Sequence, residues 1–213
     1  MDFASYIKEQ VETPLKKPVD KPKVPRWVTY IKGRIKKNKN FLGFFSGPTG
    51  IGKSYNALSA CEQIDPTFTP KRIVTSIREL LNLINTEKLS SGCAILWDEF
   101  GVGAGNRQWQ SVDNKTINFL LQTFRHRCFI LFFTAPYFDF IDSQSQKLFH
   151  AEFMCKGINY KEEKGQVKPF LLQYNSHKRK MYRKFLRYRS ERGIGKLKTW
   201  NIKKPSPELC KEY

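Results

Sequence analysis

A chain of 213 residues, 40% of them hydrophobic, is long enough to bury one core, and these values exclude a chain that is disordered throughout. The formal net charge is +19, divided unevenly: +7 over residues 1–40, +1 over residues 41–149 and +11 over residues 150–213. This distribution predicts a nearly neutral core whose basic ends meet a polyanion.

The N-terminal segment differs in composition from the rest of the chain. Prolines recur among lysines over residues 11–26, which favours an extended, flexible tether in residues 1–26. Trp27, Ile31 and Ile35 then follow at helical spacing with basic residues between them, so we expect a short amphipathic helix. Its basic face leaves two alternatives open, packing on the core or contact with nucleic acid.

A glycine-rich motif follows the apolar run at residues 41–45, which is expected to be a buried strand. The motif fits the phosphate-binding pattern G-x-x-x-x-G-K-[ST], in which backbone N–H groups surround a phosphate at the N-terminus of a helix. Lys53 would reach the β- and γ-phosphates, and the Ser54 hydroxyl would bind Mg²⁺. The predicted nucleotide-binding residues are Gly47, Pro48, Thr49, Gly50, Ile51, Gly52, Lys53 and Ser54.

Further βα units follow the predicted helix at residues 53–63. Residues 72–75 are expected to form a strand, and the apolar spacing over residues 77–84 predicts a helix. The apolar run at residues 93–97 then ends in Asp98 and Glu99, as in a buried parallel strand whose tip reaches the nucleotide. We expect Asp98 to hold Mg²⁺ and Glu99 to polarise an attacking water, which favours hydrolysis over phosphoryl transfer to a metabolite.

The next segment supplies a candidate arginine finger. Arg107 lies in the loop after Glu99, at the expected nucleotide edge of the sheet, where it could reach the γ-phosphate bound by a neighbouring subunit. Arg107 is therefore a better candidate for the arginine finger than Arg125 and Arg127, which are expected at the opposite edge of the sheet. The alternative is that Arg107 is an ordinary solvated loop arginine. Apolar spacing predicts a helix at residues 117–124, and residues 128–133 are expected to form another buried strand.

The C-terminal third is basic and rich in aromatic residues. Residues 151–160 and 167–174 are expected to pair as a β-hairpin. Residues 177–189 interleave Lys and Arg with Tyr182, Phe185 and Tyr188, a pattern that favours contact with nucleic acid through phosphates and stacking, without base-specific readout. Inward packing of these aromatic side chains is the alternative. Residues 203–213 are expected to be a frayed tail.

The remaining composition suggests a reducing compartment. The five cysteines show no C-x-x-C pair, and Cys93 and Cys128 begin apolar runs, so they are expected to be small buried hydrophobic residues. His126, His150 and His177 lack metal-ligand spacing and are expected to be solvated or hydrogen-bonded at the surface. The longest apolar run is far short of the roughly 20 residues that cross a bilayer, so we expect no membrane span and a cytoplasmic protein, in the host interior if it is viral.

Several motifs, taken in order, resemble the ATPase domain of the zonula-occludens-toxin-like family, within the HerA- and FtsK-like P-loop ATPases. They lie at residues 47–54, 75–77, 97–99, 121–127 and 129–141, and the resemblance covers about residues 40–153. It implies a strand inserted between the phosphate-loop strand and the acidic strand, hydrolysis assisted by a glutamate, ring assembly, and work on DNA or in phage-like assembly.

Two departures from that family change what is expected. Its members place Thr-Gln where this chain has Thr134-Ala135, so Thr134 alone is left to sense the γ-phosphate. Its phage members also carry a membrane span beyond the ATPase domain. No such segment is found in this sequence, which favours a soluble, DNA-directed role.

We therefore expect an α/β P-loop NTPase fold, with a mostly parallel sheet and helices on both faces. The expected parts are the tether (1–26), the ATPase core (27–153) and a basic C-terminal extension with a β-hairpin (154–213). The predicted function is Mg²⁺-dependent ATP hydrolysis by a homo-oligomer that translocates, packages or otherwise handles viral or mobile-element DNA, with a virion or portal partner. The alternatives are a helicase loader resembling DnaC and IstB, which needs a helicase partner, and a DNA-binding module with a structural nucleotide.

Overall fold

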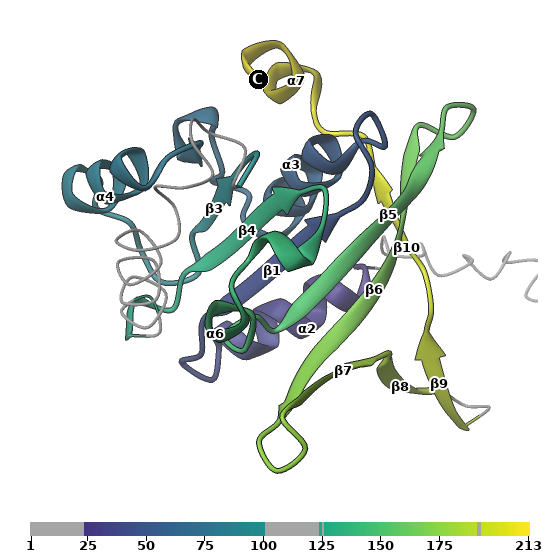
Figure 1. Ribbon diagram of the computed structural model, residues 1–213. Helices are drawn as coiled ribbons and strands as arrows, with labels where there is room; N and C mark the ends of the chain where they lie inside the picture. Colours follow the sequence, from purple (N-terminus) through teal and green to yellow (C-terminus); the bar gives the residue numbers. More distant parts are fainter. Residues whose placement is uncertain (1–23, 101–123, 125, 191–192) are drawn as a thin grey trace, which may run out of the picture.

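The computed structural model of this chain describes residues 24–100, 124, 126–190 and 193–213 (Figure 1). The helical elements are α2 (Arg26–Ile35), α3 (Lys53–Ile64), η1 (Pro70–Arg72), α4 (Ile77–Thr86), η3 (Phe138–Phe140), α6 (Ser143–Gln146) and α7 (Pro207–Glu212). The strands are β1 (Phe41–Ser46), β2 (Ile73–Val74), β3 (Ala94–Trp97), β4 (Ile130–Ala135), β5 (Ala151–Asn159), β6 (Lys164–Asn175), β7 (Lys180–Lys184), β8 (Leu186–Ser190), β9 (Gly193–Leu197) and β10 (Trp200–Lys203). The part of the loop after Glu99 that carries Arg107 and nearly all of the predicted helix at residues 117–124 lie outside the described residues.

One mixed sheet organises the fold, with the strand order β10-β6-β5-β1-β4-β3-β2. The strands from β5 to β2 in this order are mutually parallel, whereas β6 pairs antiparallel with β5, β10 and β7. Strand β4 lies between β1 and β3, with Ile130 opposite both Phe41 and Ala94. The expected strand between the phosphate-loop strand and the acidic strand is therefore confirmed.

Helices cover both faces of the sheet (Figure 1). The side chains of β1 alternate between two hydrophobic clusters: Phe41 and Phe45 face α2 and α3, whereas Leu42 and Phe44 face the side covered by α4. Because both faces are covered, every residue of β1 is buried, which explains its continuous apolar sequence. The predicted mostly parallel α/β sheet is confirmed in this coarse form.

Helix α2 packs its apolar face on the core, and contact of its basic face with nucleic acid stays a prediction. Trp27, Val28 and Ile31 are buried against the first cluster, and the Trp27 ring meets Phe153 edge to face at 5.0 Å. The helix therefore packs on the core, as its apolar spacing allowed. Cys93 and Cys128 are also buried, as predicted.

The sheet continues across residue 153, because β5 spans Ala151–Asn159 and pairs with β1 on one side and β6 on the other. Strands β10 and β7 pair with the first and last parts of β6, and β8 pairs with β9 in a separate two-stranded sheet. The boundary expected at residue 153 stays a prediction.

The expectation of a frayed tail at residues 203–213 is wrong. Helix α7 forms there, with Ser206 Oγ accepting from the Leu209 N–H at 3.4 Å. The Ser206 N–H donates to Glu62 Oε2 at 3.0 Å, and Leu209 is buried in the first cluster. Tertiary contacts with α3 therefore hold a segment too short to be stable as an isolated helix.

Within the parts of the chain that the structure describes, none of the helices combines the length and the apolar character needed to cross a bilayer.

His150 is hydrogen-bonded, as one alternative expected, but it is half-buried against the core and does not lie free at the surface. Its ring stacks on Phe41, and its Nδ1 accepts a hydrogen bond from the Leu42 N–H at 3.0 Å. Burial first, and the nearby charge of Arg34 second, lower the pKa of His150 from its ordinary 6.5 to about 3. The ring is thus held neutral at the end of the sheet where β1 begins.

This low pKa predicts acid sensitivity. Between pH 6.5 and about 3 the unfolded chain binds a proton that the native chain does not, so the free energy of unfolding falls as the pH falls, by on the order of 1 kcal/mol per pH unit. His150→Asn keeps an acceptor near the Leu42 N–H but cannot titrate, so its urea unfolding should depend less on pH between 4 and 6.5. His177→Asn, on an exposed turn, should keep the wild-type dependence. Equal pH dependence in wild type and His150→Asn would contradict this assignment.

Candidate nucleotide-binding site

The loop between β1 and α3 presents backbone donors at the end of a helix. Gly50 and Gly52 have φ of 78° and 85°, values that glycine adopts without strain, and Gly52 caps α3. The Asn56 N–H makes the first helical bond, to the Gly52 carbonyl at 3.0 Å. The N–H groups of residues 53–55 therefore have no carbonyl acceptor within the helix. Together with the positive end of the helix dipole, they can bind an anion.

Lys53 places a positive charge over the same loop. Its Nζ donates to the Pro48 carbonyl at 2.9 Å, so the side chain folds back along the loop instead of extending into solvent. A phosphate held by the loop would therefore lie within reach of this ammonium group.

Three side chains from different elements meet at the Asp98 carboxylate. Asp98 follows β3 and is 4% exposed. Its Oδ1 accepts from Ser54 Oγ, at the start of α3, at 2.9 Å and from Thr134 Oγ1, near the end of β4. The structure thus brings together Ser54, Asp98 and Thr134, whose roles stay predictions.

The donor set fits a hard divalent cation. Mg²⁺ prefers oxygen ligands, and it is commonly held in nucleotide sites by one or two protein oxygens together with phosphates. Ser54 Oγ and Asp98 Oδ1, 2.9 Å apart, supply a hydroxyl and a carboxylate at the N-terminus of the helix.

Glu99 lies in a constrained turn beside this cluster. It has a positive φ of 50°, which is uncommon for a residue other than glycine. Its N–H donates to Thr134 Oγ1 at 2.9 Å, and the Phe100 N–H donates to the Thr134 carbonyl at 2.8 Å. Strand β4 therefore fixes the turn that carries both acids, while Glu99 itself is exposed. Arg107, the candidate arginine finger, lies outside the described residues.

Sequence reasoning missed Tyr213 at this site. Its hydroxyl donates to Asp98 Oδ2, and its ring meets Tyr55 edge to face at 6.0 Å. Burial first, and the hydrogen bond to Asp98 second, raise the pKa of Tyr213 to about 12, so the hydroxyl keeps its proton at neutral pH. The spacing of apolar residues gave no signal, because Leu209 is the one buried residue of α7 and Tyr213 is 46% exposed.

An ion pair between a buried acid and an exposed arginine, at the base of the loop, was also missed. Glu152 on β5 is 3% exposed; it accepts from Ser46 Oγ at 3.0 Å and from Arg183 Nε at 2.6 Å. Ser46 directly precedes Gly47, and Arg183 lies on β7. This pair connects the phosphate loop to the basic C-terminal strands.

Exposed cations gather on the turn before β7 and on β7 and β8. We call them the basic surface: Lys178, Arg179, Lys180, Lys184, Arg187 and Arg189. Two of the three aromatic residues expected to stack on bases have protein partners. Phe185 meets Phe170 at 5.1 Å, and the Arg26 guanidinium lies 3.6 Å from the centre of the Tyr188 ring. Both side chains are half-buried, and the contact of Phe185 with Phe170 agrees with inward packing, whereas Tyr188 lies against an exposed arginine; stacking on bases stays a prediction.

Comparisons with known proteins find similarity in structure and none in sequence. No family model matches this sequence, and no curated protein matches it. Among solved structures, the chain is similar to the N-terminal domain of zonular occludens toxin from Neisseria meningitidis, with a TM-score of 0.39 and 14% identity over 70% of this chain and 95% of that chain. A likeness of this size carries no argument about family or activity, which therefore rest on the residues of the site.

The Tyr213 contact predicts competition with a cation. Replacing Tyr213 with Phe removes the hydrogen bond to Asp98 Oδ2, which draws on the charge of the carboxylate that Mg²⁺ would share. With about 1.5 kcal/mol for a hydrogen bond to a charged group, Mg²⁺ should bind up to roughly tenfold tighter in the presence of ATP. Calorimetric Mg²⁺ titration measures this, with Tyr55→Phe as the control that removes the neighbouring hydroxyl. Unchanged affinity in Tyr213→Phe would show that the contact does not compete.

Proposed function

We propose that this chain is a Mg²⁺-dependent ATPase that acts on DNA and belongs with the zonula-occludens-toxin-like P-loop ATPases. The observation that carries the proposal is the meeting of Ser54, Asp98 and Thr134 at one edge of the sheet, beside a loop of sequence G-x-x-x-x-G-K-S. A glycine turn without a nucleotide would need neither a buried carboxylate facing its serine nor a lysine folded over it.

Each residue of the site has a chemical task in this proposal. The loop N–H groups and Lys53 bind the phosphates, and Ser54 and Asp98 hold Mg²⁺. The cation, when bound, neutralises charge on the phosphate oxygens. Thr134 fixes Asp98 and the Glu99 backbone, so it can respond to occupancy at the γ-phosphate. Glu99, exposed beside the cluster, orients and deprotonates the attacking water.

DNA is the proposed partner of the basic surface. Six exposed cations on two short strands and the turn before them suit a chain of phosphates, and they imply binding without base readout. The ion pair of Arg183 with Glu152 supports a connection between this surface and the phosphate loop. We further propose a homo-oligomer in which Arg107 of one subunit reaches the nucleotide of its neighbour.

Turnover tests the catalytic assignment. Wild-type protein should release phosphate from Mg-ATP, and faster with DNA. Lys53→Ala should lose nucleotide binding, whereas Glu99→Gln should still bind ATP but hydrolyse it at least about 100-fold more slowly, because the water loses its base. Glu87→Gln, an exposed acid after α4, is the matched control and should keep full activity.

The alternatives give different results in the same assay. Hydrolysis that DNA does not stimulate but a helicase does would indicate a loader. DNA affinity indifferent to ATP, without phosphate release, would indicate a binding module. Full turnover in Glu99→Gln would overturn the role of that residue.

Charge reversal tests the DNA surface. Lys178→Glu with Lys180→Glu should weaken DNA binding and reduce the slope of log affinity against log salt by about 0.9 for each phosphate that the protein no longer neutralises. The pair Lys71→Glu and Arg78→Glu makes the same change in net charge near η1 and α4 and should leave the slope unchanged. Equal losses of affinity in both pairs, measured by fluorescence anisotropy, would mean that only the net charge matters.

A further inference from the structure

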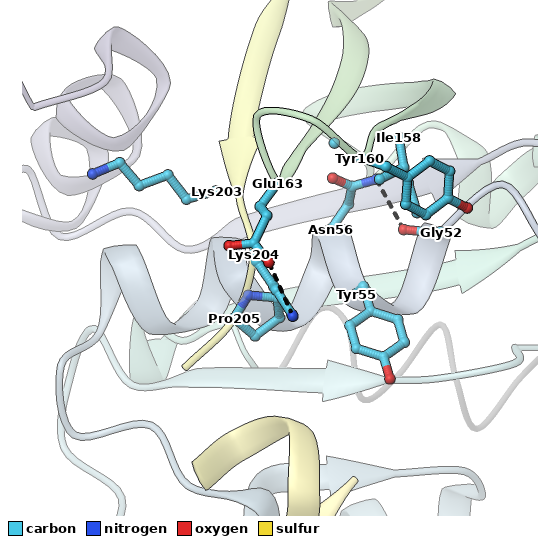
Figure 2. Close-up of a pocket in the computed structure, with 10 residues that line it drawn as sticks. Gly52, Tyr55, Asn56, Ile158, Tyr160, Glu163, Lys203, Lys204 and Pro205 are labelled. Atoms are coloured by element: carbon cyan, nitrogen blue, oxygen red, sulfur yellow. Dashed lines mark hydrogen bonds and ion pairs between the residues drawn. The ribbon is translucent and has the colours of Figure 1, made fainter. Parts of the chain in front are cut away.

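A pocket of about 380 Å³ adjoins the phosphate loop at the start of α3 (Figure 2). Its floor is the start of α3, at Gly52, Tyr55 and Asn56. The turn between β5 and β6 forms a second wall, and the chain that leads from β10 into α7 forms the third. Its volume lies in the range of small-molecule sites.

The helix fixes where this pocket lies relative to the cation site. Ser54 and Asn56 are two residues apart, so they project from nearly opposite sides of α3. The Ser54 hydroxyl meets Asp98, whereas the Asn56 amide donates to the Gly52 carbonyl at 2.8 Å and lines the pocket (Figure 2). Both sites therefore adjoin the first turn of α3, and the pocket is a neighbouring space that the other end of a nucleotide held at Ser54 could enter.

The wall formed by the β5–β6 turn is packed directly on the loop. A Cβ added to Gly165 would lie 1.8 Å from Asn56 Oδ1, and one added to Gly52 would lie 2.7 Å from Ile158 Cδ1. Asn159 Oδ1 accepts from the N–H groups of residues 161 and 162 at 3.1 and 3.3 Å, which orders the turn. The pocket is thus formed before any ligand arrives.

The lining suits a flat, partly polar ring system. Tyr160 is 81% exposed and Tyr55 is 44% exposed, so both rings offer apolar surface that a ligand could cover. Glu163 accepts from Lys204 at 3.4 Å at the rim, which places an acceptor and a donor at the edge (Figure 2). Aromatic rings bind nucleobases by stacking, and polar groups at the edge meet their exocyclic groups.

We propose that this pocket receives the nucleoside of the bound nucleotide, with its purine base against Tyr160 and its edge at Glu163 and Lys204. The inference rests on the proposed nucleotide site and deepens it, because it assigns the base to the β5–β6 turn. Base selectivity is then set by the C-terminal strands and not by the phosphate loop.

The test compares two probes, Mg-ATP and Mg-tripolyphosphate, which share the phosphate chain but differ in the nucleoside. Calorimetry on the full chain should show tighter binding of ATP in the wild type. Tyr160→Ala should weaken ATP binding about tenfold and leave tripolyphosphate binding unchanged, because one stacking contact is worth roughly 1–3 kcal/mol. Tyr160→Phe keeps the ring and should keep the affinity for ATP. Ile194→Ala, an exposed apolar side chain on β9, is the control and should bind both probes normally.

The outcomes separate the two proposals. Equal losses of affinity for both probes in Tyr160→Ala, or no loss for either, would overturn the nucleoside pocket, whereas binding of both probes by the wild type would still support the phosphate site. Wild-type protein that binds neither probe would overturn the proposed function and the pocket with it.

Discussion

The site depends on the position of β4 between β1 and β3. Ile130 aligns with Phe41 on one side and with Ala94 on the other, so all three parallel strands end at one edge. Only this order lets Thr134 reach Asp98 while Ser54, at the start of α3, approaches the same carboxylate. A chain that paired β1 directly with β3 would lack the hydroxyl that now positions both Asp98 and the Glu99 backbone.

The burial of the Asp98 carboxylate links the stability of the fold to the proposed binding of a metal. A buried charge is unfavourable unless hydrogen bonds surround it, and here hydroxyl groups from Ser54, Thr134 and Tyr213 do so. A hydroxyl can be exchanged for a cation more readily than an arginine could be, because no opposite charge has to be displaced. The acid is therefore stable in the protein alone and still available to a metal.

The sequence predicted the part of the structure that local patterns control. The continuous apolar runs of β1, β3 and β4 and the spacing in α2 and α4 indicated their positions to within a few residues, and the motif located Ser54 and Asp98. Helix α7 was missed because a buried leucine and the Ser206–Glu62 contact stabilise it, and neither is visible in a proline-flanked basic segment. His150 was misplaced for the same reason, since its partner, the Leu42 N–H, lies 108 residues away.

The ion pair between Arg183 and Glu152 sets this arginine apart from its basic neighbours. Arg183 is 43% exposed on its side chain, so it looks like one more anchor for an external phosphate, but its guanidinium already compensates an internal acid that is 4% exposed. An external phosphate would have to compete with that acid, and removing the arginine would leave the acid with Ser46 as its partner at the entrance to the loop. A loss of activity caused by altering Arg183 would therefore indicate a disturbed phosphate loop and a less stable sheet rather than weaker binding of a polyanion.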